Sequence, residues 1–357
     1  MKIFIDIGHP AHVHYFKNFI KIMEGKGHEV LITARDREVI HDLLDAENIP
    51  YINRGKGAKT LYGKILYTIK TDLLLLWHAL KFKPDIFLSH GPFYAFHVSL
   101  IIRKPCISTG DSDHINASRM LMKLVSSYLT PDVYRKSYGI NHFKFKAYME
   151  LLYLHSNYFS YDDVLIRSTL GVEKDERYFV LRFVSWNAFH DVGQGGISSE
   201  IKENLISLLS QYGKVFISSE GELPEKFEKY KVTFPPEMLH GVLAEADICI
   251  SEGATTGSEA AILGTPTIYV NSLEVSYCKE QEEKYGLSTC LKDGSGLLGK
   301  VKELLEDPQI KQKHLNKRNE LMNDKIDPTA FLVWFIENYP KSEVILKEDI
   351  NYQQRFR

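Results

Sequence analysis

Apolar residues along this chain alternate between short continuous runs and stretches with helical spacing. The short runs are rich in β-branched and aromatic residues and predict strands at 2–7, 29–34, 85–89, 105–108, 178–184, 214–218, 230–234, 247–251 and 266–270. Several are apolar at every position, which is typical of parallel strands buried on both faces. Between them lie helical patterns. In the first, Phe16, Phe19, Ile20 and Met23 recur at i, i+3, i+4 and i+7. This alternation predicts an α/β protein with doubly wound parallel sheets.

The predicted strands form two series, separated by a segment at about 130–175 that shows no clear strand pattern. We therefore expect two Rossmann-like domains, 1–170 and 171–327, followed by a strongly apolar helix and tail at 328–357. Two such domains in series predict a central cleft between them. Because ligands bind outside the carboxyl ends of parallel strands, the loops that follow the strands are the candidates for function.

Composition narrows the class of protein. The 357 residues are 44% hydrophobic and 25% charged, with a net charge of −2, so nothing favours a nucleic-acid partner. The four cysteines are scattered without a CxxC pair, which indicates free thiols. The longest apolar run, at 73–80, is far shorter than a membrane span, and residues 1–7 read as a strand rather than a signal peptide. We expect a soluble cytoplasmic protein, while peripheral association with a membrane stays open.

The most informative segment is DICISEGATTGSEAAILGTPTIYV, residues 247–270. A strand ends at Ser251, a turn of small residues follows, and a helix is predicted to open at about Ser258. Free backbone N–H groups at a helix N-terminus bind anions. The glycines would let a phosphate approach the backbone, the hydroxyls would donate, and Glu259 in the first turn would accept from a ribose. The predicted nucleotide-binding residues are Ser251, Gly253, Thr255, Thr256, Gly257, Ser258 and Glu259. Alternatively, Thr256 or Ser258 only caps the helix.

This segment resembles the nucleotide-binding segment of GT-B glycosyltransferases and non-hydrolysing UDP-N-acetylglucosamine epimerases, S-G-x-x-x-x-E-A-x-x-x-G-x-P, with one extra residue before the first Gly. Residues 1–340 also resemble a bacterial and archaeal domain of unknown function in the same superfamily. That similarity is carried by IGHPAHVHYFKN, DSDHINASR, LRFVSWNAFHDVGQGG and SEGATTGSEAAILGTP. The resemblance implies a GT-B-like fold, a sugar nucleotide held mainly by the second domain, and a C-terminal helix that crosses back to the first.

The run HPAHVH follows the first strand and allows three interpretations. His9, His12 and His14 could bind a metal ion, but Asp6 is the only carboxylate nearby in the sequence. They could be turn or cap residues. They could also handle a substrate, since a neutral imidazole exchanges protons near pH 7. We favour the third interpretation, with His12 as the catalytic candidate because it would lie centrally in the turn.

Two further loops carry chemistry. In STGDSDHINASR (108–119), Asp113 and His114 are catalytic candidates, as a base with an orienting partner. Alternatively, Asp111 or Asp113 caps a helix that runs to about Ser127. In LRFVSWNAFHDVGQGG (181–196), Arg182 and His190 are candidates to contact a departing nucleoside diphosphate.

The function we predict is metal-independent glycosyl transfer from a nucleotide sugar, with UDP the expected carrier and no further cofactor. The acceptor would be a sugar or lipid-linked sugar in polysaccharide or glycoconjugate synthesis. A nucleotide-sugar 2-epimerase is the alternative enzyme, although Pro92 replaces the acidic residue of the epimerase loop. A non-catalytic nucleotide-sugar-binding protein is the alternative outside enzymes.

Overall fold

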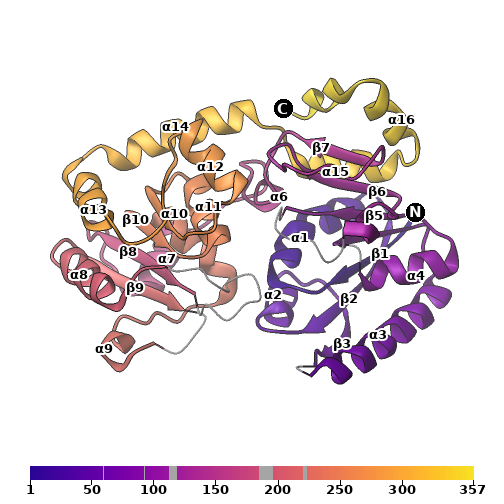
Figure 1. Cartoon of the computed structure of the whole chain (residues 1–357), viewed down its shortest axis with the longest axis horizontal. Coiled ribbons are helices and arrows are strands. Elements are labelled where there is room, and N and C mark those ends of the chain that lie inside the picture. Colours follow the sequence, from indigo (N-terminus) through magenta and orange to yellow (C-terminus); the bar gives the residue numbers. More distant parts are fainter. Residues whose placement is uncertain (59, 92, 112–118, 185–195, 220–222) are drawn as a thin grey trace. The chain divides into compact units, whose positions relative to one another are not determined.

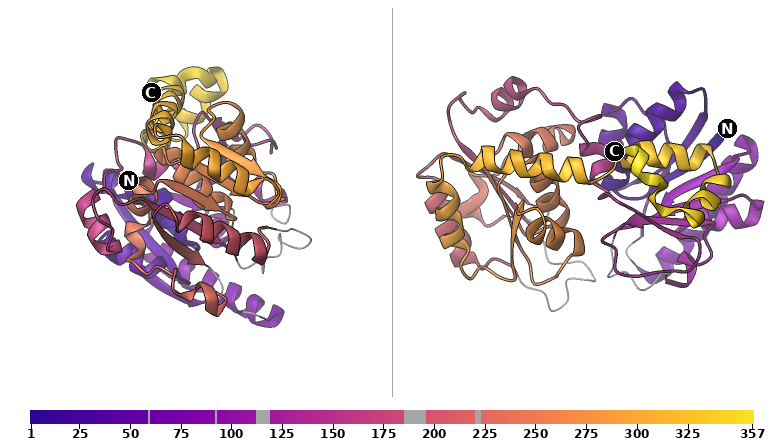
Figure 2. Two further views of the ribbon diagram at one scale, coloured as in Figure 1. Left: turned by 90° about the vertical axis from the view of Figure 1, so that its left-hand side faces the viewer. Right: turned by 90° about the horizontal axis from the view of Figure 1, so that it is seen from above.

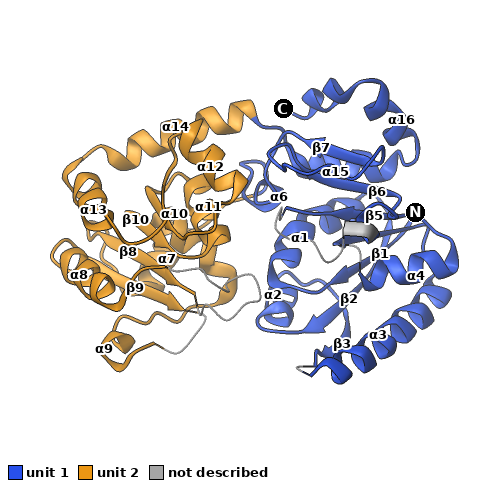
Figure 3. Cartoon of the chain, viewed as in Figure 1, with its two compact units in different colours: residues 1–158, 325–357 blue, residues 159–324 orange. Residues whose placement is uncertain are grey.

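The computed structural model of the chain describes every residue except 59, 92, 112–118, 185–195 and 220–222 (Figure 1). It divides into two compact units (Figure 3). Unit 1 is Met1–Tyr158 with Lys325–Arg357, and unit 2 is Phe159–Asp324. The boundary therefore precedes helix α7 (Asp163–Leu170), whereas the sequence placed it after residue 170. The reason is that α7 packs within unit 2, where Arg167 pairs with Glu245 at 3.2 Å.

Unit 1 is built on a seven-stranded, fully parallel sheet with the order β3-β2-β1-β4-β5-β6-β7. Its strands are β1 (Lys2–Ile7), β2 (Glu29–Asp36), β3 (Ile52–Lys56), β4 (Ile86–His90), β5 (Cys106–Thr109), β6 (Ser127–Pro131) and β7 (His142–Phe145). The order of strands reverses beside β1, so the topological switch point lies between β1 and β4. Ligands of doubly wound sheets bind at such a point.

Helices cover both faces of this sheet (Figures 1 and 2). They are α1 (Pro10–Gly25), α2 (Ile40–Ala46), α3 (Leu61–Phe82), α4 (Tyr94–Ile102), α5 (Arg119–Met122), α6 (Leu151–Leu154), α15 (Pro328–Glu337) and α16 (Lys341–Glu348), with a 3₁₀ segment at Ile350–Phe356. On one face, Phe4 and Phe87 of the sheet pack with Leu75 of α3 and Phe96 of α4.

Unit 2 has a five-stranded parallel sheet with the order β12-β11-β10-β8-β9. Its strands are β8 (Tyr178–Phe183), β9 (Lys214–Ser219), β10 (Ile248–Ser251), β11 (Thr267–Val270) and β12 (Ser288–Leu291). Besides α7, its helices are α8 (Ser199–Leu209), α9 (Glu225–Glu228), α10 (Leu239–Glu245), α11 (Ala254–Leu263), α12 (Ser276–Glu283), α13 (Leu297–Glu306) and α14 (Ile310–Asp324), with a 3₁₀ turn at Pro236–Met238. Here the order reverses between β8 and β10, which makes that gap the second switch point. The predicted class, two doubly wound α/β domains, is confirmed.

Several element predictions were wrong. Residues 230–234 form no strand; only a single bridge joins Lys231 to Ile217. Strands β3, β6, β7 and β12 were missed, and β6 and β7 begin in or near the segment that showed no strand pattern. β3 carries Asn53, Arg54 and Gly55, and β7 alternates polar and apolar residues, so neither has the continuous apolar run of the inner strands. The lack of an apolar run in β3 and β7 follows from their positions at the edges of the sheet. Like β12, each of them has a neighbouring strand on one side alone.

Helix α1 begins earlier than the sequence indicated. His9 is its N-cap and accepts a hydrogen bond from the Ala11 N–H through its ring, and Pro10 occupies the first position. The apolar stripe that contains Phe16, Phe19, Ile20 and Met23 is buried, as predicted. Gly27, at φ 84°, follows the helix end. His12 therefore lies in the first turn of a helix, not in the turn before it.

The chain returns to unit 1 through a buried anchor. Lys325 pairs with Asp132 at 3.1 Å, and its side chain is fully buried. Asp327 caps α15 and also accepts from Asn157 and Tyr158. Helix α15 then packs on α1, so the C-terminal segment is part of unit 1's core and not a loose tail.

Candidate functional site

Polar side chains gather at the switch point of unit 1, where β1, β4 and β5 end. His90, the last residue of β4, places Nε2 3.5 Å from Asp111 Oδ1 and its other ring nitrogen 3.0 Å from Thr109 Oγ1. Tyr15, one turn into α1, donates its hydroxyl to Asp111 Oδ2 at 3.0 Å. Burial would raise the pKa of Asp111, but the charge of His90 and the hydrogen bonds from His90 and Tyr15 outweigh it and lower this pKa. Asp111 is therefore an ionised carboxylate at neutral pH.

Two histidines at the start of α1 have their tautomers set by the backbone. The Gly8 N–H points at His12 Nδ1 at 3.3 Å, and the Ala11 N–H points at His9 Nδ1 at 3.2 Å. Because Nδ1 accepts a hydrogen bond, the other ring nitrogen, Nε2, carries the hydrogen in the neutral imidazole. Both rings thus offer Nε2–H donors. The His12 ring lies 4.8 Å from that of His90 and 5.9 Å from that of His9, measured between centroids.

His12 is held neutral. Burial is the main cause that lowers its pKa well below 6.5, and electrostatic repulsion by the neighbouring basic groups, His90 and His9 first and then Arg54, acts in the same direction. Arg54 belongs to a buried ion pair in which its Nε lies 2.9 Å from Asp6 Oδ1. Thr33 also donates to that carboxylate at 2.8 Å. The pair fixes β1 and β3 together directly before the turn that carries the histidines.

The three histidines of HPAHVH do different things. His9 is the N-cap of α1, and His14 is buried against Tyr153 with ring centroids 5.1 Å apart. His12 lies beside His90 and so belongs to the polar cluster, which also contains Tyr15, Thr109 and Asp111. Among the residues that the structure describes, no three His, Cys, Asp or Glu side chains form a group able to hold a metal ion. The catalytic candidates Asp113 and His114 lie outside the described residues. The helix expected to run to Ser127 is short: α5 ends at Met122, and Ser127 begins β6.

His90 and Tyr15 were missed as site residues from the sequence. His90 could have been found, since it directly follows the strand predicted at 85–89 and precedes Gly91, which has φ 78° in a turn at the functional edge of the sheet. Tyr15 gave no such signal, because an aromatic residue in an amphipathic helix is usually core. Its contact with Asp111 joins residues 96 positions apart.

In unit 2, the predicted nucleotide segment forms the end of β10 and the start of α11. The helix starts at Ala254, not near Ser258, and its N-cap is Gly253 with no capping side chain. The first turn contains no acidic residue, so Ala254, Thr255 and Thr256 present N–H groups that no side-chain cap occupies. Thr255 is exposed and Thr256 half-buried, so their hydroxyls lie at the surface of this turn. The segment has the form of an anion-binding helix terminus.

Three members of the predicted set lie deeper than expected. Gly257 and Ser258 are buried within α11, and the Ser258 hydroxyl accepts from Gln281 at 2.7 Å. Glu259 falls in the second turn rather than the first, is 4% exposed, and lies 3.0 Å from His240 Nε2. The error follows from the helix start: moving it four residues earlier carries Glu259 away from the N-terminus.

The turn before α11 is held by a buried carboxylate. Glu252 is fully buried and accepts from the N–H groups of Val184 and Ile197 and from Lys202. Ser251 hydrogen-bonds both the N–H and the carbonyl of Gly253. These bonds turn the Glu252 carboxylate away from the start of α11 and toward its own three donors. The first N–H groups of α11 therefore stay available to an anion.

Arg182 lies on β8, beside Ser251 of β10, and donates to Ser218 Oγ at 2.9 Å. It therefore sits at the switch point of unit 2, as the nucleotide prediction requires. His190 falls outside the described residues.

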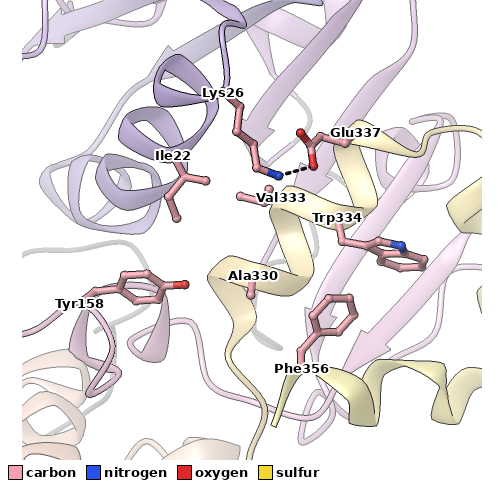
Figure 4. A pocket seen from close by; sticks show the side chains of 8 residues that line it. All are labelled: Ile22, Lys26, Tyr158, Ala330, Val333, Trp334, Glu337 and Phe356. Atoms are coloured by element: carbon pink, nitrogen blue, oxygen red, sulfur yellow. Dashed lines mark hydrogen bonds and ion pairs between the residues drawn. The ribbon is translucent and has the colours of Figure 1, made fainter.

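A pocket of about 350 Å³ lies elsewhere in unit 1 (Figure 4). Ile22 and Lys26 line it from the far end of α1, and Trp334 and Glu337 line it from α15. Lys26 and Glu337 form an ion pair across it at 2.7 Å. Because α1 rises about 1.5 Å per residue, its far end is separated from the His12 turn by more than two helical turns. The pocket is distinct from the polar cluster.

Known proteins match this architecture. The chain is 24% identical over 363 aligned residues to "Uncharacterized protein MJ0665" of Methanocaldococcus jannaschii, covering 99% of this chain and 98% of the relative. Its fold is similar to that of the UDP-GlcNAc 2-epimerase from Neisseria meningitidis bound to UDP-GlcNAc, with a TM-score of 0.63, 12% identity and coverage of 98% and 99% of the two chains. It is also similar to the Streptomyces glycosyltransferase SsfS6 complexed with thymidine diphosphate, with a TM-score of 0.60, 14% identity and coverage of 94% and 99%.

The fold is thus that of the GT-B glycosyltransferases and UDP-GlcNAc 2-epimerases, as the sequence motifs implied. Residues 1–324 match the family described as protein of unknown function DUF354, and the chain belongs to that family.

Proposed function

We propose that this protein is a glycosyltransferase of the GT-B class that uses a nucleotide-activated sugar. The observation that carries the proposal is the uncapped N-terminus of α11 at the switch point of unit 2. Backbone N–H groups and the helix dipole stabilise the negative charge that grows on a departing diphosphate. Arg182 adds a guanidinium at the same edge. Because these groups can stabilise the leaving group, the reaction is expected to need no bound metal ion.

The polar cluster of unit 1 supplies the remaining chemistry. The Asp111 carboxylate is the base candidate, since it is ionised and has lone pairs beyond those used by Tyr15 and His90. His12 and His9 supply Nε2–H donors for hydroxyl or phosphate oxygens. This changes the role predicted for His12 from proton shuttle to hydrogen-bond donor. Asp113 and His114 stay catalytic candidates, as a base with an orienting partner, and His190 stays a candidate to contact the departing nucleoside diphosphate.

Glu259 remains our candidate for the ribose hydroxyls, with His240 orienting its carboxylate. The nucleotide is expected to be UDP, and the acceptor a sugar or lipid-linked sugar in surface polysaccharide or glycoconjugate synthesis.

The second candidate function is nucleotide-sugar 2-epimerisation. The contact between Asp111, Tyr15 and His90 favours it, because three groups able to accept or donate a proton meet at one edge of the sheet. An epimerase must remove a proton from sugar C2 and return it on the other face.

One experiment separates the two. The protein is incubated with a panel of UDP- and dTDP-sugars in D₂O, with and without sugar acceptors, and the products are identified by mass spectrometry. A transferase releases nucleoside diphosphate only with an acceptor. An epimerase incorporates one deuterium into a sugar that remains on its nucleotide. Absence of both, together with tight nucleotide-sugar binding in calorimetry, would identify a non-catalytic binding protein instead.

A further inference from the structure

Helix α3 is apolar on two opposite faces, and only one of them is buried. Its inner face contributes Thr71, Leu75 and Ala79 to the core of unit 1. Its outer face carries large apolar side chains that are 52–77% exposed: Leu61, Ile65, Ile69, Leu73, Trp77 and Leu80. A helix that is apolar all round is normally covered on all sides. The outer face of α3 is therefore a candidate interaction surface.

The exposed side chains form one continuous stripe. Ile65, Ile69, Leu73 and Trp77 follow one another at intervals of four residues, and Leu80 comes three later, so all point to the same side of the helix. With 22 residues, the helix is about 33 Å long at 1.5 Å per residue. Isolated exposed apolar residues need no explanation, but a stripe along a whole helix does.

Basic residues outnumber acidic ones in the segment that carries the stripe. Residues 61–104 contain six basic side chains, Lys64, Lys70, Lys81, Lys83, Arg103 and Lys104, and two acidic ones, Asp72 and Asp85. Asp72 is paired with His97 at 3.1 Å, and its hydrogen bond raises the pKa of that imidazole. Asp85 accepts from the backbone N–H of Lys2. The excess of cations is therefore not balanced locally.

The neighbouring helix extends this composition. Helices α3 and α4 lie side by side at the margin of unit 1 (Figure 1). Near its end at Ile102, helix α4 carries Leu100 and Ile101, which are 56% and 60% exposed, and the exposed Arg103 and Lys104 follow the helix. On α3, the Lys81 ammonium lies 3.6 Å from the centre of the Trp77 ring. Such an aromatic and cationic pair suits a boundary between lipid tails and head groups.

We propose that α3 binds in the surface plane of an anionic phospholipid bilayer. The stripe from Leu61 to Leu80 would enter the region between head groups and acyl chains, and the flanking lysines would contact lipid phosphates. The helix would lie on the membrane and not cross it, since its sequence includes three lysines and one aspartate. Among the described residues, no helix is both long and apolar enough to span a bilayer. This inference does not depend on the proposed activity.

A second copy of the chain is the competing occupant, and charge argues against it. In a two-fold interface the same surface contributes from both molecules. Pairing two α3 stripes would bring Lys70 and Lys81 of one copy close to the lysines of the other, with only one, already paired, aspartate on each helix to offset them. Anionic lipid meets the same surface with complementary charge.

The test is flotation of the full chain with vesicles of phosphatidylcholine alone and of phosphatidylcholine with about 30% phosphatidylglycerol, an anionic lipid. We expect binding to the anionic vesicles that falls at least tenfold when salt is raised from about 0.1 M to about 0.5 M, because salt screens the lysines. The double variant Leu73→Ser with Trp77→Ser should lower binding at least tenfold. Both side chains are exposed, so its melting temperature should stay unchanged.

The matched control changes exposed apolar residues of unit 2. Val164 and Leu165 on α7 are 71% and 54% exposed, and Val164→Ser with Leu165→Ser should bind vesicles as the unchanged chain does. The proposal is overturned if the chain ignores anionic vesicles, or if both double variants bind equally well. It is also overturned if sedimentation velocity shows a dimer that Leu73→Ser with Trp77→Ser dissociates. None of these results bears on nucleotide-sugar turnover, which is measured without vesicles.

Discussion

The carboxyl edges of the two sheets have the same topology but opposite chemistry. In each unit the order of strands reverses beside the first strand, and a helix starts at that point. At the edge of unit 1, the residues are imidazoles, a phenol and a carboxylate, all able to share or move protons. At the edge of unit 2, they are glycines and threonines in front of an uncapped helix. One edge suits proton chemistry, and the other suits binding of an anion.

The helix N-caps show how this difference arises. In α1 the His9 ring accepts the Ala11 N–H, so a side chain occupies part of the helix terminus. In α11 the cap is Gly253, which has no side chain, and the preceding Glu252 is turned inward to three donors of its own. Two similar strand–helix junctions thus acquire different uses through the residue at one position.

Asp111→Asn should have the largest effect. Asparagine keeps the shape and can still accept from Tyr15, but it cannot take a proton. We expect kcat to fall roughly 10²–10⁴-fold, the range for losing a general base, with nucleotide affinity unchanged. Turnover and calorimetric titration measure the two quantities. The matched control is Asp72→Asn, which removes a carboxylate that is paired with a histidine elsewhere in unit 1. Equal losses in both variants would show that Asp111 matters only for the fold.

His12 tests whether the edge of unit 1 donates or shuttles protons. His12→Ala removes the Nε2–H donor, and we expect kcat to fall roughly 10²–10³-fold, as for loss of one donor to a developing negative charge. His12→Gln supplies an amide N–H but cannot carry a proton, and should stay within about tenfold of the original rate. A Gln variant as slow as the Ala variant would contradict the donor role and restore acid–base catalysis by His12.

The fold could be predicted from the sequence wherever strands are inner and fully apolar. Strands β1, β4, β8 and β10 were found because burial on both faces demands continuous apolar runs. Edge strands such as β3, with Arg54 in its centre, need not be apolar at every position and so lack this pattern. The turn of small residues between β10 and α11 was also predicted, because Gly and Thr often form the link between a strand and a helix.

The polar cluster could be predicted only in part. His12 was found from its place after β1, but its tautomer depends on a hydrogen bond from Gly8 that no sequence pattern reveals. The contact of Tyr15 with Asp111 joins two segments far apart in the chain. The start of α11 was misplaced because Ser258 and Thr256 resemble caps, whereas glycine at the cap leaves no side-chain signal.

Thr255→Glu should sharpen the contrast at the edge of unit 2. Thr255 is the second residue of α11 and is exposed, so glutamate fits without a clash. A carboxylate in the first turn should stabilise the helix by about 0.3–1 kcal/mol through the dipole. The same charge should repel a bound diphosphate and weaken UDP binding roughly 10–100-fold. Thr255→Gln is the uncharged control. Unchanged UDP affinity for Thr255→Glu would mean that nucleotide binds elsewhere.

The smallest predicted effect is the acid sensitivity of unit 1. Burial lowers the pKa of His142 to about 4, with a contribution from Lys144, and lowers that of His12 well below 6.5. Between these values and 6.5 the unfolded chain binds more protons, so stability falls as the pH drops through that window. His97, whose pKa is raised, acts in the opposite direction.

In unit 2, burial also lowers the pKa of His314, but the hydrogen bond with the Ile310 carbonyl opposes that shift. The difference in acid sensitivity between the two units can be followed by tryptophan fluorescence. The variant Trp186→Phe leaves Trp77 and Trp334, both in unit 1, as the reporters of unfolding. Each pKa unit corresponds to about 1.4 kcal/mol, and screening at the half-buried His142 ring reduces it. From about pH 7.5 to about pH 5 we expect a loss of roughly 1–2 kcal/mol in urea unfolding. His142→Gln should flatten this dependence more than His314→Gln, and the reverse order would show that acid acts first on unit 2.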